Sequence, residues 1–264
     1  MNKDSLGDRM KTYEGVTRHY LTRRMPTIIR IDGKAFHSFT KGLKKPFDNI
    51  LINSMQETAK YLCENIQGCK IAYTQSDEIS LLLTDYDDIN TSAWFDNNIS
   101  KVISISASMA TLVFNKNFKE NTNSLNDKNF KTLEEYLITK KIYEKKFDKA
   151  LFDSRVFNIP KEDICNYFIW RQQDCIRNSI EMVGRTNFSY KQLYKVNCNQ
   201  IQDKLLKEKN INWTTFPTYQ KRGSCIIKEK YYLNDDNNTQ RTRWIVDKNI
   251  PVFTENRDYI EKYL

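Results

Sequence analysis

Short apolar runs alternate with longer amphipathic stretches through the first half of the chain. Residues 27–31 form a β-branched run before an Asp-Gly pair, which predicts a buried strand that ends in a turn. From residue 47 to about residue 66, apolar side chains recur at helical spacing and predict an amphipathic helix packed on the sheet. The runs 70–74 and 79–83 are close enough in sequence to predict a hairpin.

The pattern continues with a second helix and a fourth strand. Residues 92–114 have helical periodicity, and residues 115–148 are rich in Asn, Lys and Glu, which is typical of an insertion or a peripheral helix. Residues 152–159 are a candidate strand, and Pro160 is placed to start a long helix. The order βαββαβ is that of the ferredoxin-like split unit, so we predict an α/β (α+β) fold with an antiparallel sheet.

The pattern is weaker after about residue 188. Residues 224–227 and 242–246 flank a polar stretch at 234–238, which predicts a second hairpin. We therefore expect a core over residues 1–160 and a C-terminal portion over residues 161–264, made of a helix and a hairpin that pack on the core.

Composition and charge narrow the class of protein. The chain has 264 residues, of which 39% are hydrophobic, and its 14 Phe and 15 Tyr exclude disorder throughout. No apolar run reaches the roughly 18 to 20 residues of a membrane helix, and the polar start lacks a signal pattern, so we expect a cytoplasmic location and no membrane partner. The formal net charge of +9 favours polyanionic partners, although many basic proteins bind none.

The number and spacing of the cysteines and histidines argue against a zinc site. None of the six cysteines forms a C-x-x-C pair, and the chain has only two histidines. We expect reduced and mostly packed thiols.

Three carboxylates are placed to meet at one end of the sheet. Asp32 follows the first strand, and Asp77 and Glu78 lie in the turn of the predicted hairpin. Closely spaced carboxylates repel unless a divalent cation lies between them or one is protonated, and oxygen ligands select Mg²⁺. Two such ions would suit an in-line displacement at phosphorus. The alternative is a turn aspartate and a solvated acidic pair.

The residues after Asp32 offer groups that bind phosphate. Gly33 and the amides that follow it could cradle a triphosphate near Lys34, although a glycine turn that enters a helix is the commoner explanation. His37 could donate to a phosphate or be packed. Lys44 and Lys45 are more typical of a solvated turn than of a phosphate clamp.

Four blocks in this order resemble the tRNA-histidine guanylyltransferase superfamily, over about residues 5–260. They are Arg-Ile-Asp-Gly-Lys-Ala-Phe-His at 30–37, Lys-Pro-Phe-Asp at 45–48, Tyr-Thr-Gln-Ser-Asp-Glu at 73–78 and Trp-Arg-Gln-Gln-Asp-Cys at 170–175. The resemblance implies a palm-like catalytic domain, similar to that of ordinary polymerases, in an enzyme that extends RNA at its 5′ end in the 3′-to-5′ direction.

The resemblance also implies roles for individual residues. Asp32 and Asp77 would hold two Mg²⁺ ions with the Gly33 carbonyl as a further ligand, and Glu78 would support this site. The nucleotide triphosphate would be held by the segment after the first strand and by the hairpin turn: Asp32, Gly33, Lys34, Ala35, Phe36, His37, Ser76 and Asp77. Lys45, Asp48 and Lys101 would lie near the nucleotide or its phosphates.

Two departures from the family pattern indicate a branch. Ile176 stands where the guanylyltransferases proper have a histidine associated with reading histidine tRNA, and Asn97 and Asn98 replace a basic pair. These differences resemble the guanylyltransferase-like proteins, which repair 5′-truncated tRNA by template-directed addition after ATP-dependent activation. A harmless change on a buried helix face is the alternative for Ile176.

The implied partners are tRNA, ATP, and GTP or another NTP, with a homotetramer as the implied assembly. Candidate contacts to RNA phosphates are basic residues outside the carboxylate centre: Arg18, Arg23, Arg24, Lys221, Arg222, Arg241 and Arg243. Three other functions remain open, namely addition of a single G before the first nucleotide of histidine tRNA, a palm-type nucleotide cyclase, and a non-catalytic RNA-binding module.

Overall fold

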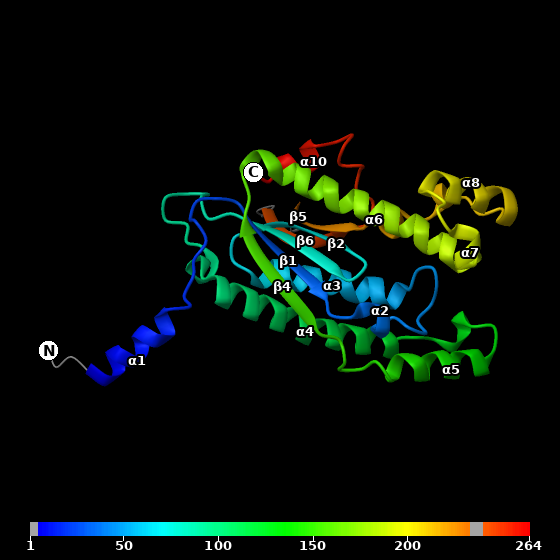
Figure 1. The fold of residues 1–264 in the computed structure, drawn as a ribbon, viewed down its shortest axis with the longest axis horizontal. Helices are drawn as coiled ribbons and strands as arrows, with labels where there is room; N and C mark the ends of the chain where they lie inside the picture. Colours follow the sequence, from blue (N-terminus) through cyan, green and yellow to red (C-terminus); the bar gives the residue numbers. More distant parts are fainter. Residues whose placement is uncertain (1–4, 233–239) are drawn as a thin grey trace.

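A single six-stranded antiparallel sheet organises the computed structural model, which describes residues 5–232 and 240–264 (Figure 1). The strand order is β4-β1-β3-β2-β5-β6. The strands span β1 Thr27–Gly33, β2 Cys69–Gln75, β3 Glu78–Leu83, β4 Phe152–Asn158, β5 Ser224–Tyr232 and β6 Gln240–Asp247. The first four strands have the order of a ferredoxin-like βαββαβ unit, so the predicted fold class is confirmed.

Helices cover both faces of this sheet. α3 (Asn49–Asn65) and α4 (Ile99–Asn123) pack on one face, and α6 (Ile164–Asn187) packs on the other (Figure 1). Alternation along β1 divides its side chains between the two cores, because Ile29 faces α3 and α4 whereas Ile28 faces α6. The strand-like run in the sequence is therefore apolar on both faces.

The C-terminal hairpin extends the sheet beyond β2. Ala72, Tyr73 and Thr74 of β2 pair with β5, which in turn pairs with β6. The predicted hairpin is thus present, while its predicted turn at 234–238 lies outside the described residues.

The predicted helix over residues 92–114 has different bounds. Phe95, Asp96 and Asn97 have left-handed backbone angles, with φ of 48°, 57° and 61°, so α4 begins only at Ile99. The Asn98 side chain accepts a hydrogen bond from the Lys101 amide and caps the helix. The helix then continues to Asn123, so part of the expected insertion belongs to α4; the rest holds α5 (Leu133–Glu144).

Helices also form where the sequence pattern was weak. α7 (Tyr190–Leu193) and α8 (Cys198–Lys209) pack against the end of α6 around a small third core that includes Val183 and Leu205. The remaining helices are α1 (Ser5–Gly15), α2 (Phe36–Phe39), α9 (Thr218–Arg222) and α10 (Asp258–Glu261). Short 3₁₀ turns lie at Trp94–Asn97, Asp127–Asn129, Lys161–Asp163 and Trp213–Thr215.

The described part of the chain contains neither a membrane-spanning helix nor a disulfide bond. Its helices include none with the length and apolar character needed to cross a bilayer. None of the six cysteines forms a disulfide; five are buried and Cys198 is partly exposed, so the predicted packing of most of these side chains is confirmed.

Candidate active site

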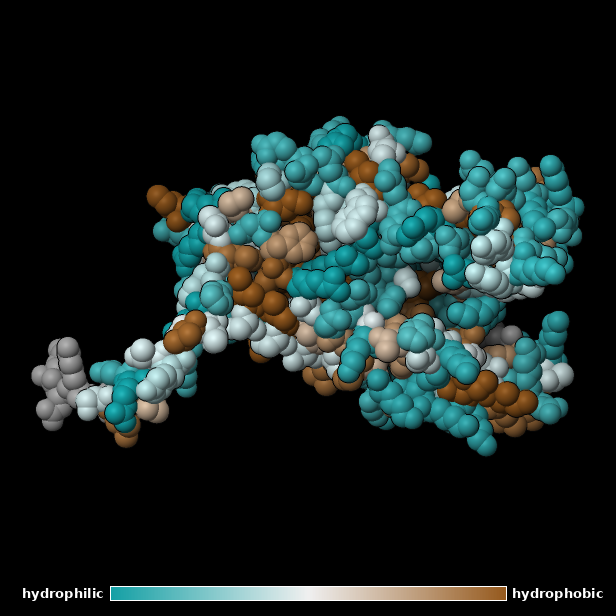
Figure 2. All heavy atoms as spheres, in the orientation of Figure 1, coloured by the Kyte–Doolittle hydropathy of each residue, from teal (hydrophilic) through white to brown (hydrophobic). Residues whose placement is uncertain are grey.

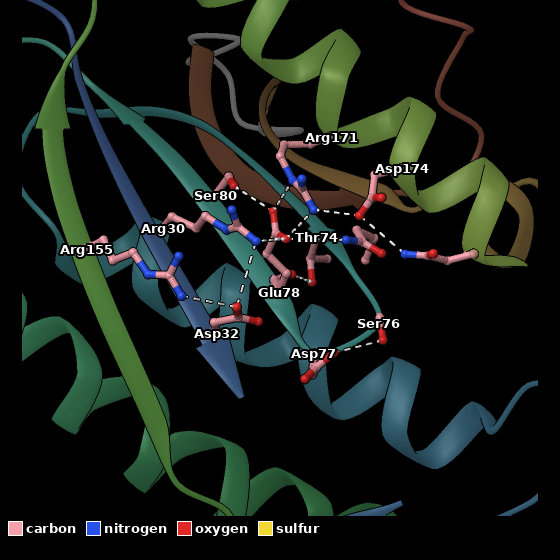
Figure 3. A network of polar contacts seen from close by, with 12 residues as sticks. Arg30, Asp32, Thr74, Ser76, Asp77, Glu78, Ser80, Arg155, Arg171 and Asp174 are labelled. Atoms are coloured by element: carbon pink, nitrogen blue, oxygen red, sulfur yellow. Dashed lines mark hydrogen bonds and ion pairs between the residues drawn. The ribbon is translucent and has the colours of Figure 1, made fainter. Parts of the chain in front are cut away.

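The ends of β1 and β3 bring Asp32 and Asp77 to the same end of the sheet (Figure 3). Asp32 lies opposite Glu78 in the antiparallel register, so the preceding residue, Asp77, falls in the turn beside it. The Gly33 amide donates a hydrogen bond to the Asp77 carbonyl at 3.0 Å and ties the two segments together. The structure therefore joins two carboxylates that are 45 positions apart, as expected from the hairpin.

The two carboxylates of this pair differ in their surroundings. Burial raises the pKa of Asp77, the negative charge of Asp32 raises it further, and the hydroxyl of Ser76, which donates to Asp77 Oδ1 at 2.9 Å, partly opposes the rise. The Asp32 carboxylate is less enclosed and lies 3.5 Å from Arg155 Nη2 and 3.7 Å from Arg30 Nη2. Among the described residues no group of three His, Cys, Asp or Glu side chains forms a metal cluster, so any ion here would need backbone, water or substrate oxygens as well.

Glu78 does not join this pair. Its carboxylate points away from the turn and accepts two hydrogen bonds from Arg171, from Nε and Nη2, both at 2.7 Å (Figure 3). Arg30 Nη2 adds a third contact at 2.9 Å. The side chains of Glu78 and Arg171 are only 4% and 5% exposed, so Glu78 is enclosed by guanidinium groups and is not open to a metal or a substrate.

Arg171 extends this network to helix α6. Burial alone would lower the pKa of Arg171, but the carboxylates of Glu78 and Asp174 outweigh it and raise the pKa. Arg171 Nη2 also donates to Asp174 at 2.9 Å, and the Trp170 ring lies 4.4 Å from the Arg171 guanidinium carbon. Arg30 and Arg171 belong to the sequence blocks at 30–37 and 170–175, but no sequence signal pointed to their pairing with Glu78.

The turn after β1 is shaped by Gly33. A Cβ at this position would lie 2.3 Å from Cδ2 of Phe36, whose ring is buried among Phe39, Phe114 and Phe152. The Phe36 side chain therefore belongs to the core, and only its backbone can reach a nucleotide.

The amides of this turn are partly available. The Lys34 amide donates to the Leu151 carbonyl at 2.8 Å. The amides of Ala35, Phe36 and His37 have no acceptor within the described ranges, and Ala35 has a left-handed φ of 55°. The side chains of Lys34 and His37 are exposed, and His37 Nε2 lies 3.0 Å from the Ser38 hydroxyl. This arrangement can present several donors to an anion.

Asp48 has a structural role that the sequence did not reveal. Its buried carboxylate caps α3 by accepting from the Leu51 amide, and it also accepts from the Lys44 amide, both at 2.9 Å. The Tyr143 hydroxyl donates to it as well, and burial together with Asp48 raises the pKa of that phenol. No oxygen of Asp48 faces solvent freely, whereas neighbouring Lys45 is exposed.

A hollow begins beside the turn that carries Asp77. A cavity of about 130 Å³ is lined largely by apolar groups, including Leu43, Phe47, Met182 and Tyr219, and by Ser76. It shares Lys45, Ser76, Asn178 and Met182 with a wider hollow of about 560 Å³. Figure 2 shows the surface indented between the end that carries α8 and the end that carries α5.

Lys101 lies away from this centre within the chain. It is the third residue of α4, whereas Phe114, which contacts Phe36, lies 13 residues further along the same helix. That separation corresponds to about 20 Å at about 1.5 Å per residue. Within one copy of the chain, Lys101 is therefore not brought to Asp32 and Asp77.

Several known proteins resemble this chain in sequence. A sequence profile of the family described as tRNAHis guanylyltransferase matches residues 7–160. An uncharacterised protein of Acanthamoeba polyphaga mimivirus is 29% identical over 245 residues, which are 89% of this chain and 80% of that protein. The tRNA(His) guanylyltransferase of Debaryomyces hansenii is 27% identical over 237 residues, 84% of this chain and 80% of the relative.

Solved structures extend the similarity to the whole chain. A bacterial tRNA(His) guanylyltransferase-like protein in complex with ATP is 46% identical, with a TM-score of 0.82 and coverage of 98% of both chains. A second such structure, in complex with GTP, is 44% identical with a TM-score of 0.79, and covers 98% of this chain and 99% of its own. Since the family profile also spans more than half of the residues, this chain belongs to the tRNA(His) guanylyltransferase family and is a nucleotidyltransferase that acts on tRNA.

Proposed function

We propose that this protein is a template-dependent 3′-to-5′ nucleotidyltransferase that adds nucleotides to the 5′ end of truncated tRNA. The observation that carries the proposal is the pairing of Asp32 and Asp77 at one end of a palm-type sheet, beside a hollow large enough to admit a nucleotide. The guanylyltransferase-like structures bound to ATP and to GTP, at 46% and 44% identity, support this branch of the family.

The residues at the centre fit Mg²⁺. The oxygens of Asp32, Asp77 and the Gly33 carbonyl are the hard ligands that Mg²⁺ prefers. Burial and the nearby charge of Asp32 raise the pKa of Asp77, and a bound cation would stabilise its ionised form. When bound, Mg²⁺ would stabilise charge on the reacting phosphate and on the leaving oxygen. Glu78, held by Arg30 and Arg171, acts as a positioning residue that fixes the start of β3 next to this pair.

The chain would orient two successive displacements at phosphorus. In the first, an oxygen of the RNA 5′-monophosphate attacks the α-phosphorus of ATP and releases pyrophosphate. In the second, the 3′-hydroxyl of an incoming NTP loses its proton and attacks the activated 5′ phosphate, which releases AMP. Both steps need alignment and charge stabilisation rather than a protein nucleophile.

Several side chains are placed for this work. The exposed Lys34, the free amides at residues 35–37 and the guanidinium of Arg155 surround Asp32 with donors for phosphate oxygens. The largely apolar cavity lined by Phe47 and Tyr219 would take a nucleobase or ribose, with Lys45 at its edge. We assign Asp48 to the support of this cavity wall, through its cap on α3.

The basic residues proposed to contact RNA are not equally available. Arg222 Nε donates to the Ile250 carbonyl at 3.1 Å, which is a structural contact. Arg23 pairs with Asp96 and Arg243 with Glu229, and these partly exposed pairs would have to exchange partners to bind RNA. The homotetramer and the involvement of Lys101 stay predictions, and Lys101 would reach a carboxylate centre only in another copy.

The test is an extension assay on a 5′-monophosphorylated tRNA that lacks its first nucleotide, with Mg²⁺, ATP and all four NTPs. We expect growth at the 5′ end that follows Watson-Crick pairing when the opposing template base is varied. Asp77→Asn should abolish extension, while Asp203→Asn, an exposed substitution on α8 with the same charge change, should not.

Other outcomes would assign another function. Addition of one G to histidine tRNA alone would make this a guanylyltransferase proper. Turnover of an NTP without RNA would indicate a cyclase, and RNA binding without any turnover would indicate a non-catalytic module.

A further inference from the structure

Five lysines surround a hollow next to the turn that follows Asp32. The hollow has a volume of about 540 Å³ and lies between the α2 segment and the end of α5. We call it the lysine hollow. Its five lysines come from two distant parts of the sequence: Lys34, Lys41, Lys145, Lys146 and Lys149. Lys34 is two residues from Asp32, so the hollow begins at the edge of the proposed catalytic centre.

Within the described residues, no acidic side chain neutralises the positive charge of the lysine hollow. None of the five lysines forms an ion pair with a residue in the described ranges, and no Asp or Glu is among the lining residues. Burial lowers the pKa of Lys146, and the charges of Lys149 and Lys41 lower it further. Lys146 Nζ donates to the Ser38 carbonyl at 3.3 Å, which holds its charge at the hollow rather than out in solvent.

A bound anion would relieve the repulsion between these lysine side chains. Lysine ammonium groups bind phosphate as point charges without a fixed geometry. This suits the phosphates of a flexible RNA strand better than a single rigid phosphate group. A nucleoside triphosphate normally binds together with Mg²⁺, which needs oxygen ligands from the protein, and the lining residues supply no carboxylate. Backbone phosphates of RNA need only cations.

We propose that the lysine hollow binds backbone phosphates of the RNA strand, next to its reacting 5′ end. This inference rests on the proposed function, because it takes the end of the RNA to lie at Asp32 and Asp77. It assigns a task to the region of α5, for which the sequence pattern predicts only an insertion or a peripheral helix. The lysines at 145, 146 and 149 would hold the strand so that its 5′ phosphate stays at the carboxylate centre.

The test compares two variants of the full chain with equal loss of charge. One is Lys145→Ala, Lys146→Ala and Lys149→Ala together. The control is Lys11→Ala, Lys161→Ala and Lys207→Ala together, three exposed lysines on α1, on the turn before α6 and on α8. The dissociation constant of a 5′-monophosphorylated tRNA is measured for each between about 50 and 200 mM salt, and that of Mg-ATP is measured separately.

The hollow variant should bind tRNA more weakly, and the slope of log K against log salt should fall by about 2 to 3, since each lost phosphate contact removes about 0.7 to 0.9. The control should keep a slope close to that of the unmodified protein, and Mg-ATP binding should be unchanged in both. A double variant, Lys145→Ala with Lys149→Ala, keeps the Lys146 contact to Ser38 and should show about two thirds of the slope change seen in the triple variant. Equal melting temperatures would show that the variants are folded.

Two results would overturn the inference. If the hollow variant and the control lose the same slope, the effect is one of net charge and not of this hollow. If tRNA binding is unchanged and Mg-ATP binding weakens, the hollow serves a triphosphate. Because both readouts are binding constants, they are independent of the extension assay, whose failure would defeat the proposed function alone.

Discussion

Replacing Glu78 by glutamine removes the negative charge that lies between two guanidinium groups. The Glu78 side chain is 4% exposed, with Arg171 at 2.7 Å and Arg30 at 2.9 Å. A glutamine keeps one acceptor oxygen but turns an NH₂ group toward the guanidinium donors, so Arg171 loses its main counterion and, among the described residues, keeps only Asp174. Breaking a buried pair by removing one partner costs about 3 to 5 kcal/mol.

This cost can be measured as a change in thermal stability. At about 2 to 4 °C per kcal/mol for a chain of this size, Glu78→Gln should lower the melting temperature by about 6 to 20 °C. The matched control is Glu261→Gln, which breaks an exposed i,i+4 pair with Arg257 at 2.9 Å and should cost under about 0.5 kcal/mol. Differential scanning calorimetry or circular dichroism on both variants gives the comparison.

A double-mutant cycle separates the charge pair from other effects of the substitution. Arg171→Met leaves Glu78 still paired with Arg30, so it should cost less than Glu78→Gln. The double variant should cost less than the sum of the two single changes, because it also removes the buried Arg171 charge that Glu78→Gln leaves without its main partner. If Glu78→Gln melts at the same temperature as Glu261→Gln, the network contributes little stability and does not fix the start of β3.

Three further results follow from single substitutions near the centre. Asp77→Asn should stabilise the metal-free protein, since burial and Asp32 raise the pKa of Asp77 in the folded state. This gain in unfolding free energy over the unmodified protein should grow as pH rises above the ordinary aspartate pKa and shrink as pH falls. Urea unfolding at several pH values measures it. Gly33→Ala places a Cβ 2.3 Å from the Phe36 ring and should cost about 1 to 3 kcal/mol in urea unfolding. Asp48→Asn should let the Tyr143 phenol ionise at lower pH, as followed by ultraviolet titration, because the charge of Asp48 is one cause of its raised pKa.

Each of these three predictions has an outcome that would contradict it. A metal-free Asp77→Asn protein that is less stable at neutral pH than the unmodified protein would contradict the repulsion inferred for the carboxylate pair. Gly15→Ala is the control for the glycine change, since a Cβ there meets nothing within 4 Å, and an equal cost at Gly33 and Gly15 would remove the role of the Phe36 ring. An unchanged Tyr143 titration would mean that burial alone raises its pKa.

Local pattern in the sequence was sufficient for much of the fold. The β-branched run at residues 27–31 predicted a buried strand, and the helical period over residues 47–66 predicted an amphipathic helix; both elements lie where predicted. The close spacing of the two strand runs determined the hairpin, and with it the proximity of Asp77 to Asp32. The late start of α4 was missed because left-handed angles at Phe95 to Asn97 leave no mark on hydrophobic periodicity.

Tertiary structure alone decided how the charges are distributed. Glu78 reads as a third acid beside Asp77, but its partner Arg171 is 93 positions away and reaches it only because α6 packs across the sheet. Asp48 and Tyr143 are separated by 95 positions, and Lys34 joins the lysines after α5 only through the packing of α2 against that segment. Periodicity is a local property of the backbone, whereas the partner of a charge depends on which elements meet in space, and this is why the sequence alone predicted the two carboxylates but not the arginines and lysines around them.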